Sequence, residues 1–307
     1  MRRLAKSRMH AEPQERTEEL ETPKQATEQF EAYRPLLLGL AYRLLGSMWD
    51  AEDVVQDAYL RWTNTDRADI REPRAFLITI VSRLALDQLR SARVTREAYT
   101  GPWLPEPVAT AALGPLDTAE LRDTVAYATI HLMERLSPPE RAVFVLREAF
   151  DLPYDEIARI LDTTSSNCRQ MHSRAGRRVT SGRDKFALAE DDHAKLLARF
   201  LEAAQSGDLT GLTELLTEDV VAWNDGGGKV RAALRPIEGR ARVVAFIAGL
   251  VTRYPFGDAR VVTANGLPAL ALTVDGIEQV VTISVHEGRI DGVYAVLNPD
   301  KLGHMEL

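Results

Sequence analysis

The chain has 307 residues, of which 45% are hydrophobic, and a formal net charge of −7. At roughly 100–150 residues per domain, this length predicts two or three compact units. The longest uninterrupted apolar run, residues 243–251, is too short to span a bilayer, and the N-terminus lacks the apolar block of a secretory signal. We therefore expect a cytoplasmic protein without membrane contact.

The single cysteine, Cys168, excludes an internal disulfide, and no Cys/His cluster has the spacing of a zinc site, so neither a metal nor a cofactor is expected.

Residues 1–26 are rich in charged side chains and poor in large apolar ones. Such a segment buries too little surface to offset the entropy of ordering, so we expect a disordered extension. A helical domain is predicted over residues 27–95. Its first helix, residues 30–45, repeats apolar side chains every three or four positions and ends at Gly46.

The second helix opens with "SMWDAEDVVQDAYLRW", in which acidic side chains crowd the first turn, where carboxylates suit the positive end of the helix dipole. A polar loop, residues 64–73, follows. The third helix begins near Arg74 and is apolar around most of its circumference, so we expect it to be largely buried. One stripe on it is polar and mostly basic: Thr79, Arg83, Asp87 and Arg90.

A linker is predicted over residues 96–120, which contain four prolines and two glycines. This composition resists helix formation and favours extended chain. The "WLPEPV" core is too apolar for a solvated tether, so we expect Trp103 and Leu104 to dock on another part of the molecule.

Four short helices are predicted over residues 121–186. In the last pair, Asp162 and Thr163 form a tight turn, and Cys168, Met171 and Ala175 face inward at spacings of three and four. This periodicity is typical of a helix-turn-helix.

The exposed side of the last helix carries charge of one sign, because residues 169–185 contain six basic side chains and a single acid. Arginines and amides recognise base edges, and hydroxyls and further arginines bind phosphate. A charged face that is merely solvated is the alternative. The single sign of the charge and its place after a tight turn favour DNA recognition.

From residue 190 the pattern changes to two helices, a strand with a glycine-rich turn, a helix and three further strand segments. Helices followed by antiparallel strands predict an α+β domain with a curved sheet over residues 190–307.

At this point a family resemblance becomes clear. "LSPPERAVFVLREAFDLPYDEIARILDTTSSNCRQMHSRAGRRV" resembles region 4 of extracytoplasmic-function sigma factors, and "YRPLLLGLAYRLLGSMWDAEDVVQDAYLRW" with "PRAFLITIVSRLALDQLRS" resembles region 2, in the family's order. One departure is Asp162, where the family usually has glycine; aspartate tolerates a positive φ better than most residues. "WLPEPV", "DGGGK" and "NPDKL" look like signatures of the sigma-J-like subgroup. The resemblance implies two all-α sigma domains, the second a helix-turn-helix, followed by an α+β SnoaL-like domain of the cystatin or NTF2 type.

The resemblance implies an alternative sigma factor that binds core RNA polymerase, through the clamp of the largest subunit and the β flap, and recognises the minus-35 and minus-10 elements of promoter DNA at two places held apart by the linker. The residues implied to bind polymerase are Asp50, Glu52, Asp53 and Asp57. Those implied at the minus-10 element are Trp62, Asn64, Arg74, Phe76, Thr79, Arg83, Asp87 and Arg90. Those implied at the minus-35 element are Ser166, Asn167, Arg169, Gln170, Ser173, Arg174, Arg177 and Arg178. For Trp62 and Phe76, base stacking and ordinary core packing both remain open.

In the subgroup the extra domain modulates the sigma activity of its own chain, and we expect it to contact the sigma domains and the linker. The residues implied in these regulatory contacts are Trp103, Leu104, Pro105, Asp225, Gly226, Gly227, Gly228, Lys229, Asn298, Pro299, Asp300 and Lys301. For the three glycines, a close approach of the backbone and a plain hairpin turn both remain open.

Two other functions of the C-terminal domain remain open. SnoaL-like domains include cyclases and isomerases, which need a carboxylate or imidazole to move a proton; the candidates are Asp225, Asp275, His286 and Asp291. No catalytic motif transfers to these positions, so we do not expect an enzyme. The domain could instead bind an unknown small apolar ligand. A plain two-domain repressor is disfavoured by the acidic second helix and the buried third helix.

Overall fold

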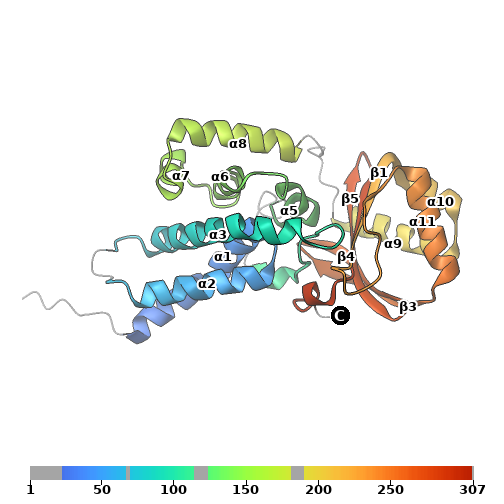
Figure 1. The fold of residues 1–307 in the computed structure, drawn as a ribbon, viewed down its shortest axis with the longest axis horizontal. Coiled ribbons are helices and arrows are strands. Elements are labelled where there is room, and N and C mark those ends of the chain that lie inside the picture. Colours follow the sequence, from blue (N-terminus) through green and yellow to red (C-terminus); the bar gives the residue numbers. More distant parts are fainter. Residues whose placement is uncertain (1–22, 67–69, 114–123, 181–189, 306–307) are drawn as a thin grey trace, which may run out of the picture.

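The computed structural model describes residues 23–66, 70–113, 124–180 and 190–305. The molecule is elongated, with the helical domains at one end and the α+β domain at the other (Figure 1). The predicted extension falls almost entirely outside the described residues, as do parts of the predicted loop, the linker and the connection at residues 181–189. No described helix combines the length and the apolar character needed to cross a membrane.

Three helices form the first domain: α1 (Pro23–Leu45), α2 (Met48–Thr63) and α3 (Pro73–Glu97). Helix α1 begins before the predicted limit of the extension because Ala26 is buried and its carbonyl accepts a hydrogen bond from the Trp62 indole at 2.9 Å. Gly46 ends α1 with a φ of +69°. Ser47 then caps α2, its hydroxyl accepting from the Asp50 amide at 3.2 Å.

The linker is extended up to a short 3-10 helix, η1 (Thr110–Leu113). Leu104, Glu106 and Val108 are buried in it, so the chain here is packed into the molecule, as its apolar composition predicts. The last two residues of helix α3, 96 and 97, fall within the predicted linker.

The second helical domain contains α5 (Tyr127–Met133), α6 (Pro138–Glu148), α7 (Tyr154–Leu161) and α8 (Ser165–Thr180). Asp162 takes the left-handed conformation, φ 51° and ψ 54°, between α7 and α8, which is the geometry that the helix-turn-helix needs. Thr164 caps α8, since its hydroxyl accepts from the Asn167 amide at 3.2 Å. The predicted helix-turn-helix is confirmed.

The two helical domains share one continuous apolar core, in which α3 packs against both α6 and α7. The sequence resemblance predicts a linker that holds these domains apart. In this structure they are in contact, because the linker folds back along α1 and α2 instead of extending between the domains.

The C-terminal domain contains a six-stranded sheet in the order β2-β1-β6-β5-β4-β3. Its elements are α9 (Glu190–Ser206), α10 (Leu209–Leu215), β1 (Leu216–Asp225), β2 (Ile237–Glu238), α11 (Arg240–Arg253), β3 (Phe256–Ala264), β4 (Leu267–Val274), β5 (Ile277–His286), β6 (Arg289–Val296) and η2 (Pro299–Lys301). The strand pairs after α11 are antiparallel, as expected, whereas β1 and β6 are parallel. The reason is that β1 is joined to the hairpins β3 to β6 through the helix α11, a connection that allows parallel pairing.

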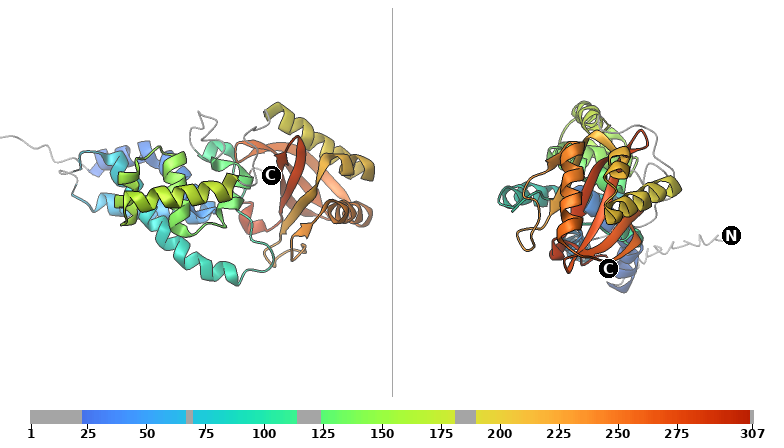
Figure 2. Two further views of the ribbon diagram at one scale, coloured as in Figure 1. Left: turned by 90° about the horizontal axis from the view of Figure 1, so that it is seen from above. Right: turned by 90° about the vertical axis from the view of Figure 1, so that its right-hand side faces the viewer.

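The two faces of the sheet have different partners. Helices α9, α10 and α11 cover one face and form an apolar core with it. The other face packs against Leu104 of the linker, Tyr127 of α5, and Leu302 and Met305 near the C-terminus. The right-hand view of Figure 2 shows α9 and α11 in front of the sheet and the helical domains behind it. The linker and α5 therefore lie directly against the second face.

Candidate nucleic-acid interface and interdomain contacts

Helix α8 separates an apolar inner side from a polar outer side. Cys168, Met171, Ala175 and Val179 are buried. Burial raises the pKa of the Cys168 thiol, as suits a core residue. All eight residues predicted for minus-35 recognition are exposed: Ser166, Asn167, Arg169, Gln170, Ser173, Arg174, Arg177 and Arg178. The whole predicted set is therefore accessible.

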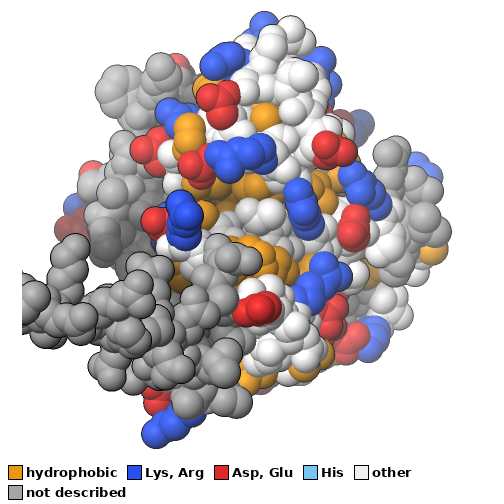
Figure 3. Space-filling model, turned by 90° about the vertical axis from the view of Figure 1, so that its left-hand side faces the viewer, with side chains coloured by type: hydrophobic (Ala, Val, Ile, Leu, Met, Phe, Trp, Pro, Cys, Tyr) orange, Lys and Arg blue, Asp and Glu red, His pale blue; other side chains and the backbone are white. Residues whose placement is uncertain are grey.

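Neighbouring side chains orient three of these arginines. Arg174 and Arg178 form ion pairs with Glu140 at 3.4 and 2.9 Å, and Arg169 lies over the Tyr154 ring at 5.3 Å. Burial alone would raise the pKa of Glu140, but hydrogen bonds from Ser137 and the two arginines lower it. Figure 3 shows the face of the molecule that is on the left in Figure 1. On this face, basic side chains are interspersed with acidic and apolar ones.

The basic stripe of α3 is partly occupied within the molecule. Arg83 donates from Nε to the Ile160 carbonyl at 3.2 Å and from Nη2 to the Arg159 carbonyl at 3.0 Å, at the end of α7. Asp87 and Arg90 form an exposed ion pair at 3.0 Å. The hydroxyl of Thr79 donates to a carbonyl within α3. Arg83 is thus the residue of this stripe that joins the two helical domains.

The surroundings of Trp62 bear on its two interpretations. Its side chain is fully buried, its indole N–H is bonded to the main chain of α1, and it packs against Phe76 at a centroid distance of 6.0 Å. This burial favours core packing of Trp62 over base stacking in the present arrangement, because no face of the ring is open. Asn64 and Arg74 are exposed on either side of residues 67–69, which lie outside the described residues.

The first turn of α2 is covered by residues near the C-terminus. Trp49 donates from Nε1 to the Asp300 carbonyl at 3.1 Å, and its ring packs against His304 at 4.4 Å. His304 Nε2 also lies 3.4 Å from Glu52 Oε2. Of the four acids predicted to bind polymerase, Glu52 and Asp50 have partners inside the molecule, Asp50 accepting from Gln88 at 3.3 Å. The other two, Asp53 and Asp57, are exposed.

A linker carboxylate stabilises the start of the same helix. Glu106 accepts hydrogen bonds from the Ser47 hydroxyl and the Met48 amide, both at 2.7 Å. Burial raises the pKa of Glu106, although these hydrogen bonds oppose the shift. The Glu106 carbonyl accepts from the Tyr42 hydroxyl at 2.7 Å. The linker is therefore bound to both α1 and α2.

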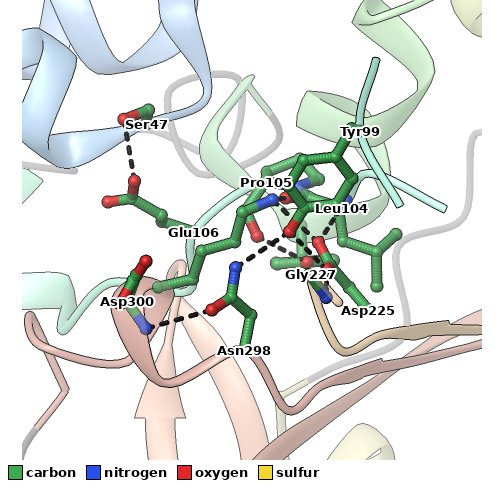
Figure 4. Close-up of polar contacts among 11 residues, drawn as sticks. Ser47, Tyr99, Leu104, Pro105, Glu106, Asp225, Gly227, Asn298 and Asp300 are labelled. Carbon is green, nitrogen blue, oxygen red and sulfur yellow. Dashed lines mark hydrogen bonds and ion pairs between the residues drawn. The ribbon is translucent and has the colours of Figure 1, made fainter. Parts of the chain in front are cut away.

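The other end of the "WLPEPV" segment is held by a group that we name the Asp225 cluster: Tyr99, Leu104, Asp225, Asn298 and Lys301. Asp225 is fully buried and accepts from the Tyr99 hydroxyl at 2.6 Å, the Leu104 amide at 2.8 Å and Lys301 Nζ at 2.7 Å (Figure 4). Asn298 donates to the Tyr99 hydroxyl at 2.9 Å. These contacts tie the linker to β1 and to the segment after β6.

Lys301 contacts the linker through its ammonium group. Its ammonium group donates to the Leu104 carbonyl and lies 4.1 Å from the Trp103 ring and 4.7 Å from the Tyr99 ring. Burial and the neighbouring Asp225 carboxylate raise the pKa of Tyr99. The ammonium and carboxylate thus neutralise each other where water is excluded.

Among the three glycines, Gly227 is the one at which a positive φ coincides with a close approach to the Asp225 cluster. Its φ is +59°, and an added Cβ would lie 2.3 Å from Asn298 Nδ2 and 2.9 Å from the Tyr99 hydroxyl. This favours a close approach of the backbone over a plain hairpin turn. Next to the cluster, Lys229 and Asp300 form an ion pair that is half exposed, and the Pro105 carbonyl accepts from the Tyr127 hydroxyl at 2.7 Å.

Sequence patterns alone did not identify two other interdomain contacts. Asn265, buried in the turn between β3 and β4 with a φ of 54°, donates to the Tyr42 hydroxyl at 2.6 Å and to the Val125 carbonyl at 3.1 Å. The "NG" pair predicts a turn there, but not its partners. His131 of α5 packs edge-on against the stacked rings of Trp223 and Tyr294 of the sheet, at 5.1 and 5.3 Å. Burial lowers the pKa of His131 to about 4.

The four candidates for proton transfer do not come together. Asp225 is neutralised by Lys301, and Asp291 accepts from the Ser284 hydroxyl at 2.5 Å. His286 ends β5 beside a turn, and Asp275 sits in another turn with a φ of 53°. In the described part of the chain, no three His, Cys, Asp or Glu side chains are placed to hold a metal ion.

Comparison with known proteins agrees with this architecture. Residues 29–95 match sigma-70 region 2, residues 128–179 match sigma-70 region 4, and residues 197–298 match the SnoaL-like domain. The chain is 40% identical to the ECF RNA polymerase sigma factor SigJ of Mycobacterium tuberculosis, over 89% of this chain and 92% of that one. It is 33% identical to the probable ECF sigma factor SigI of the same species, over 88% and 92%.

The crystal structure of Mycobacterium tuberculosis SigJ superposes with a TM-score of 0.76 and 37% identity, covering 92% of this chain and 99% of that chain. Its likeness extends through both helical domains and the C-terminal domain, because it covers nearly the whole of each chain. These matches show that the chain belongs to the extracytoplasmic-function family of RNA polymerase sigma factors, which are non-enzymatic transcription-initiation factors, and that it carries a SnoaL-like domain.

Proposed function

We propose that this sigma factor binds core RNA polymerase, that α8 reads the minus-35 element as duplex DNA, that α3 and the connection before it hold the opened minus-10 strand, and that the SnoaL-like domain modulates these activities in cis. The eight exposed polar side chains over the apolar inner side of α8 support its role. The buried Asp225–Lys301 pair, which ties the linker to the SnoaL-like domain, is the observation that carries the regulatory part.

The packing of the helical domains indicates that the sigma factor has to open. The names of the two promoter elements place them about 25 base pairs apart, which is roughly 85 Å along B-DNA at 3.4 Å per base pair. Arg83 of α3 is hydrogen-bonded to the end of α7, the helix just before α8. The two helical domains cannot each reach their own promoter element while this contact holds. We therefore expect them to separate when the promoter is bound.

The SnoaL-like domain contacts both halves that would separate. Asn265 binds Tyr42 of α1, and the aromatic pair of Trp223 and Tyr294 holds His131 of α5. The Asp225 cluster holds the linker between them. The domain therefore stabilises the closed arrangement, and the strength of these contacts sets how readily the sigma domains separate.

Polymerase docking would compete with the residues that cover α2. The exposed Asp53 and Asp57 suit the first contact with a basic clamp surface, whereas Glu52 lies against His304. A clamp that engages the whole acidic turn has to displace Trp49 from the Asp300 carbonyl. Binding to polymerase would thus loosen the SnoaL-like domain from the first sigma domain.

In-vitro transcription with core RNA polymerase tests the proposal. Full-length protein is compared with a chain truncated after Lys185 and with Asp225→Asn, and Lys229→Gln is the matched control for a neighbouring but exposed ion pair. Equal transcript yields from all four would contradict modulation in cis. Separately, unchanged start-site selection by an Arg169→Ala, Arg174→Ala variant would contradict the role of α8.

A further inference from the structure

The SnoaL-like domain contains a cavity that none of the contacts above uses. Its volume is about 450 Å³, and it lies between α11, residues 231–233 and the strands β1, β4 and β5. Apolar side chains form much of its wall, including Phe246, Leu250, Ile277 and Leu297. This volume is in the range of sites for small organic ligands, roughly 300–1,000 Å³.

One polar group in the wall is left unsatisfied. Asn224 lines the cavity and is 8% exposed, and its Nδ2 has no hydrogen-bond partner among the described residues. It faces the same side of β1 as Val220 and Ala222, which belong to the core under α11. A buried amide donor without a partner is costly, so its retention in a cavity wall points to an acceptor that comes from outside the chain.

The charged side chains of the wall favour an anion. Arg231 and Arg253 line the cavity and are exposed, and neither forms an ion pair with another described residue. Asp275, in the turn between β4 and β5, is the only carboxylate among the described residues of the wall. Two guanidinium groups against one carboxylate leave the mouth of the cavity positive.

We propose that the cavity binds a small, mainly apolar organic anion, such as an aromatic or alicyclic carboxylate. Its apolar body lies against Phe246 and Leu250, its charged oxygen accepts a hydrogen bond from Asn224 Nδ2, and Arg253 and Arg231 provide the positive charge at the mouth. None of the four candidates for proton transfer is required for this binding, so the site is a receptor for the anion.

Ligand binding to this cavity is also the signal that we propose for the regulation in cis, and this regulatory role rests on the proposed function. Asn224 and Leu297 in the cavity wall directly precede Asp225 and Asn298 of the Asp225 cluster. The Leu297 amide donates to the Asp225 carbonyl at 2.8 Å. A ligand that reorients Asn224 therefore acts on the main chain that positions the cluster, on the opposite face of the sheet.

Two fluorescent probes test the binding site. The anion 8-anilinonaphthalene-1-sulfonate and the neutral N-phenyl-1-naphthylamine share the same aromatic body and differ by the sulfonate. We expect the full-length protein to bind the anionic probe about tenfold or more tightly than the neutral one, as a hydrogen bond to a charged group implies. Equal affinities for the two probes, or binding of neither, would overturn the proposal.

Three variants locate the site. Asn224→Asp keeps the shape but replaces the donor with a negative charge, so it should weaken binding of the anionic probe about tenfold or more and leave the neutral probe nearly unchanged. Arg253→Gln, at an exposed position, should weaken only the anionic probe, by about two- to fivefold. Arg242→Gln, exposed on α11 outside this cavity, is the matched control and should change neither. Anionic-probe binding that survives both Asn224→Asp and Arg253→Gln would place the probe elsewhere and refute the assignment.

Hydrogen exchange tests the connection to the linker. The Leu104 amide is buried and bonded to Asp225, so peptides covering residues 99–108 report on the cluster. Saturation with the anionic probe should change their exchange rate in wild type and not in Asn224→Asp. An unchanged rate would overturn the connection while leaving the site intact. A failure of modulation in cis would appear instead in the transcription assay, which contains no probe.

Discussion

Replacing Asp225 by asparagine tests how strongly the SnoaL-like domain holds the linker. The Asp225 and Lys301 side chains are 0% and 8% exposed and their charged atoms are 2.7 Å apart. Asparagine keeps the shape but leaves the Lys301 ammonium group buried without a counter-charge. Loss of one partner of a buried ion pair costs about 3–5 kcal/mol. Because an asparagine oxygen still accepts one hydrogen bond from the linker, we expect a loss near the lower limit, about 3 kcal/mol.

The control lies beside it on the same interface. Lys229 and Asp300 also form an ion pair, but their side chains are 51% and 61% exposed. Solvent screens such a pair, so Lys229→Gln should cost less than about 1 kcal/mol. A double variant, Asp225→Asn with Lys301→Met, removes both buried charges and should recover part of the lost stability.

Urea unfolding measures the free energy of unfolding of each variant. Hydrogen exchange at the Leu104 amide, which donates to Asp225, shows whether the loss of stability is located at the linker. Asp225→Asn should accelerate exchange there, while Lys229→Gln should not. If the two single variants lose the same stability and leave exchange at Leu104 equal, the buried pair does not hold the linker and the reasoning fails.

Three other predictions concern separate parts of the molecule. Arg169→Ala should lower the affinity of the holoenzyme for its promoter about tenfold or more, measured by filter binding; an equal loss on DNA without a minus-35 element would argue against base recognition. Burial holds the pKa of His131 at about 4 in the folded protein, below its usual value near 6.5. Its contribution to the free energy of unfolding is therefore complete above pH 6.5 and falls by about 3 kcal/mol as the pH drops to 4. His131→Phe, which keeps a ring against Trp223, should lack this part of the pH dependence in unfolding experiments. Gly227→Ala should lower the melting temperature more than Gly288→Ala, because both glycines have positive φ but only Gly227 has neighbours within 4 Å of an added Cβ; equal shifts would show that backbone strain alone matters.

Local patterns in the sequence predicted the helical elements well. Apolar spacing and capping residues gave the helices of both sigma domains, and Asp162 takes the left-handed conformation that the turn requires. The inward side of α8 is as predicted, with Cys168 and Ala175 fully buried. These features depend on neighbours three or four residues away, which a single sequence contains.

Contacts between distant segments could not be predicted in this way. Asn265 and Tyr42 are 223 residues apart, and only the folded arrangement makes them partners. Trp62 has the spacing of both a core residue and a stacking residue, and the choice depends on the start of α1, which composition had assigned to the disordered extension. The parallel pairing of β1 and β6 depends on the path of the chain through α11, which strand patterns do not specify.

The linker segment from Tyr99 to Val108 lies between the sheet and the helical domains. Its position bears on whether the helical part and the SnoaL-like part still bind each other when they are expressed as separate polypeptides. Leu104 and Tyr127 of the helical part bury apolar surface against Tyr294, Val296 and Leu302 of the SnoaL-like part. The two parts are therefore held together by a non-covalent interface in addition to the chain connection through residues 181–189. Expressed as separate polypeptides ending and beginning in that stretch, they should associate in solution, so that the SnoaL-like domain behaves as a protein partner supplied in trans.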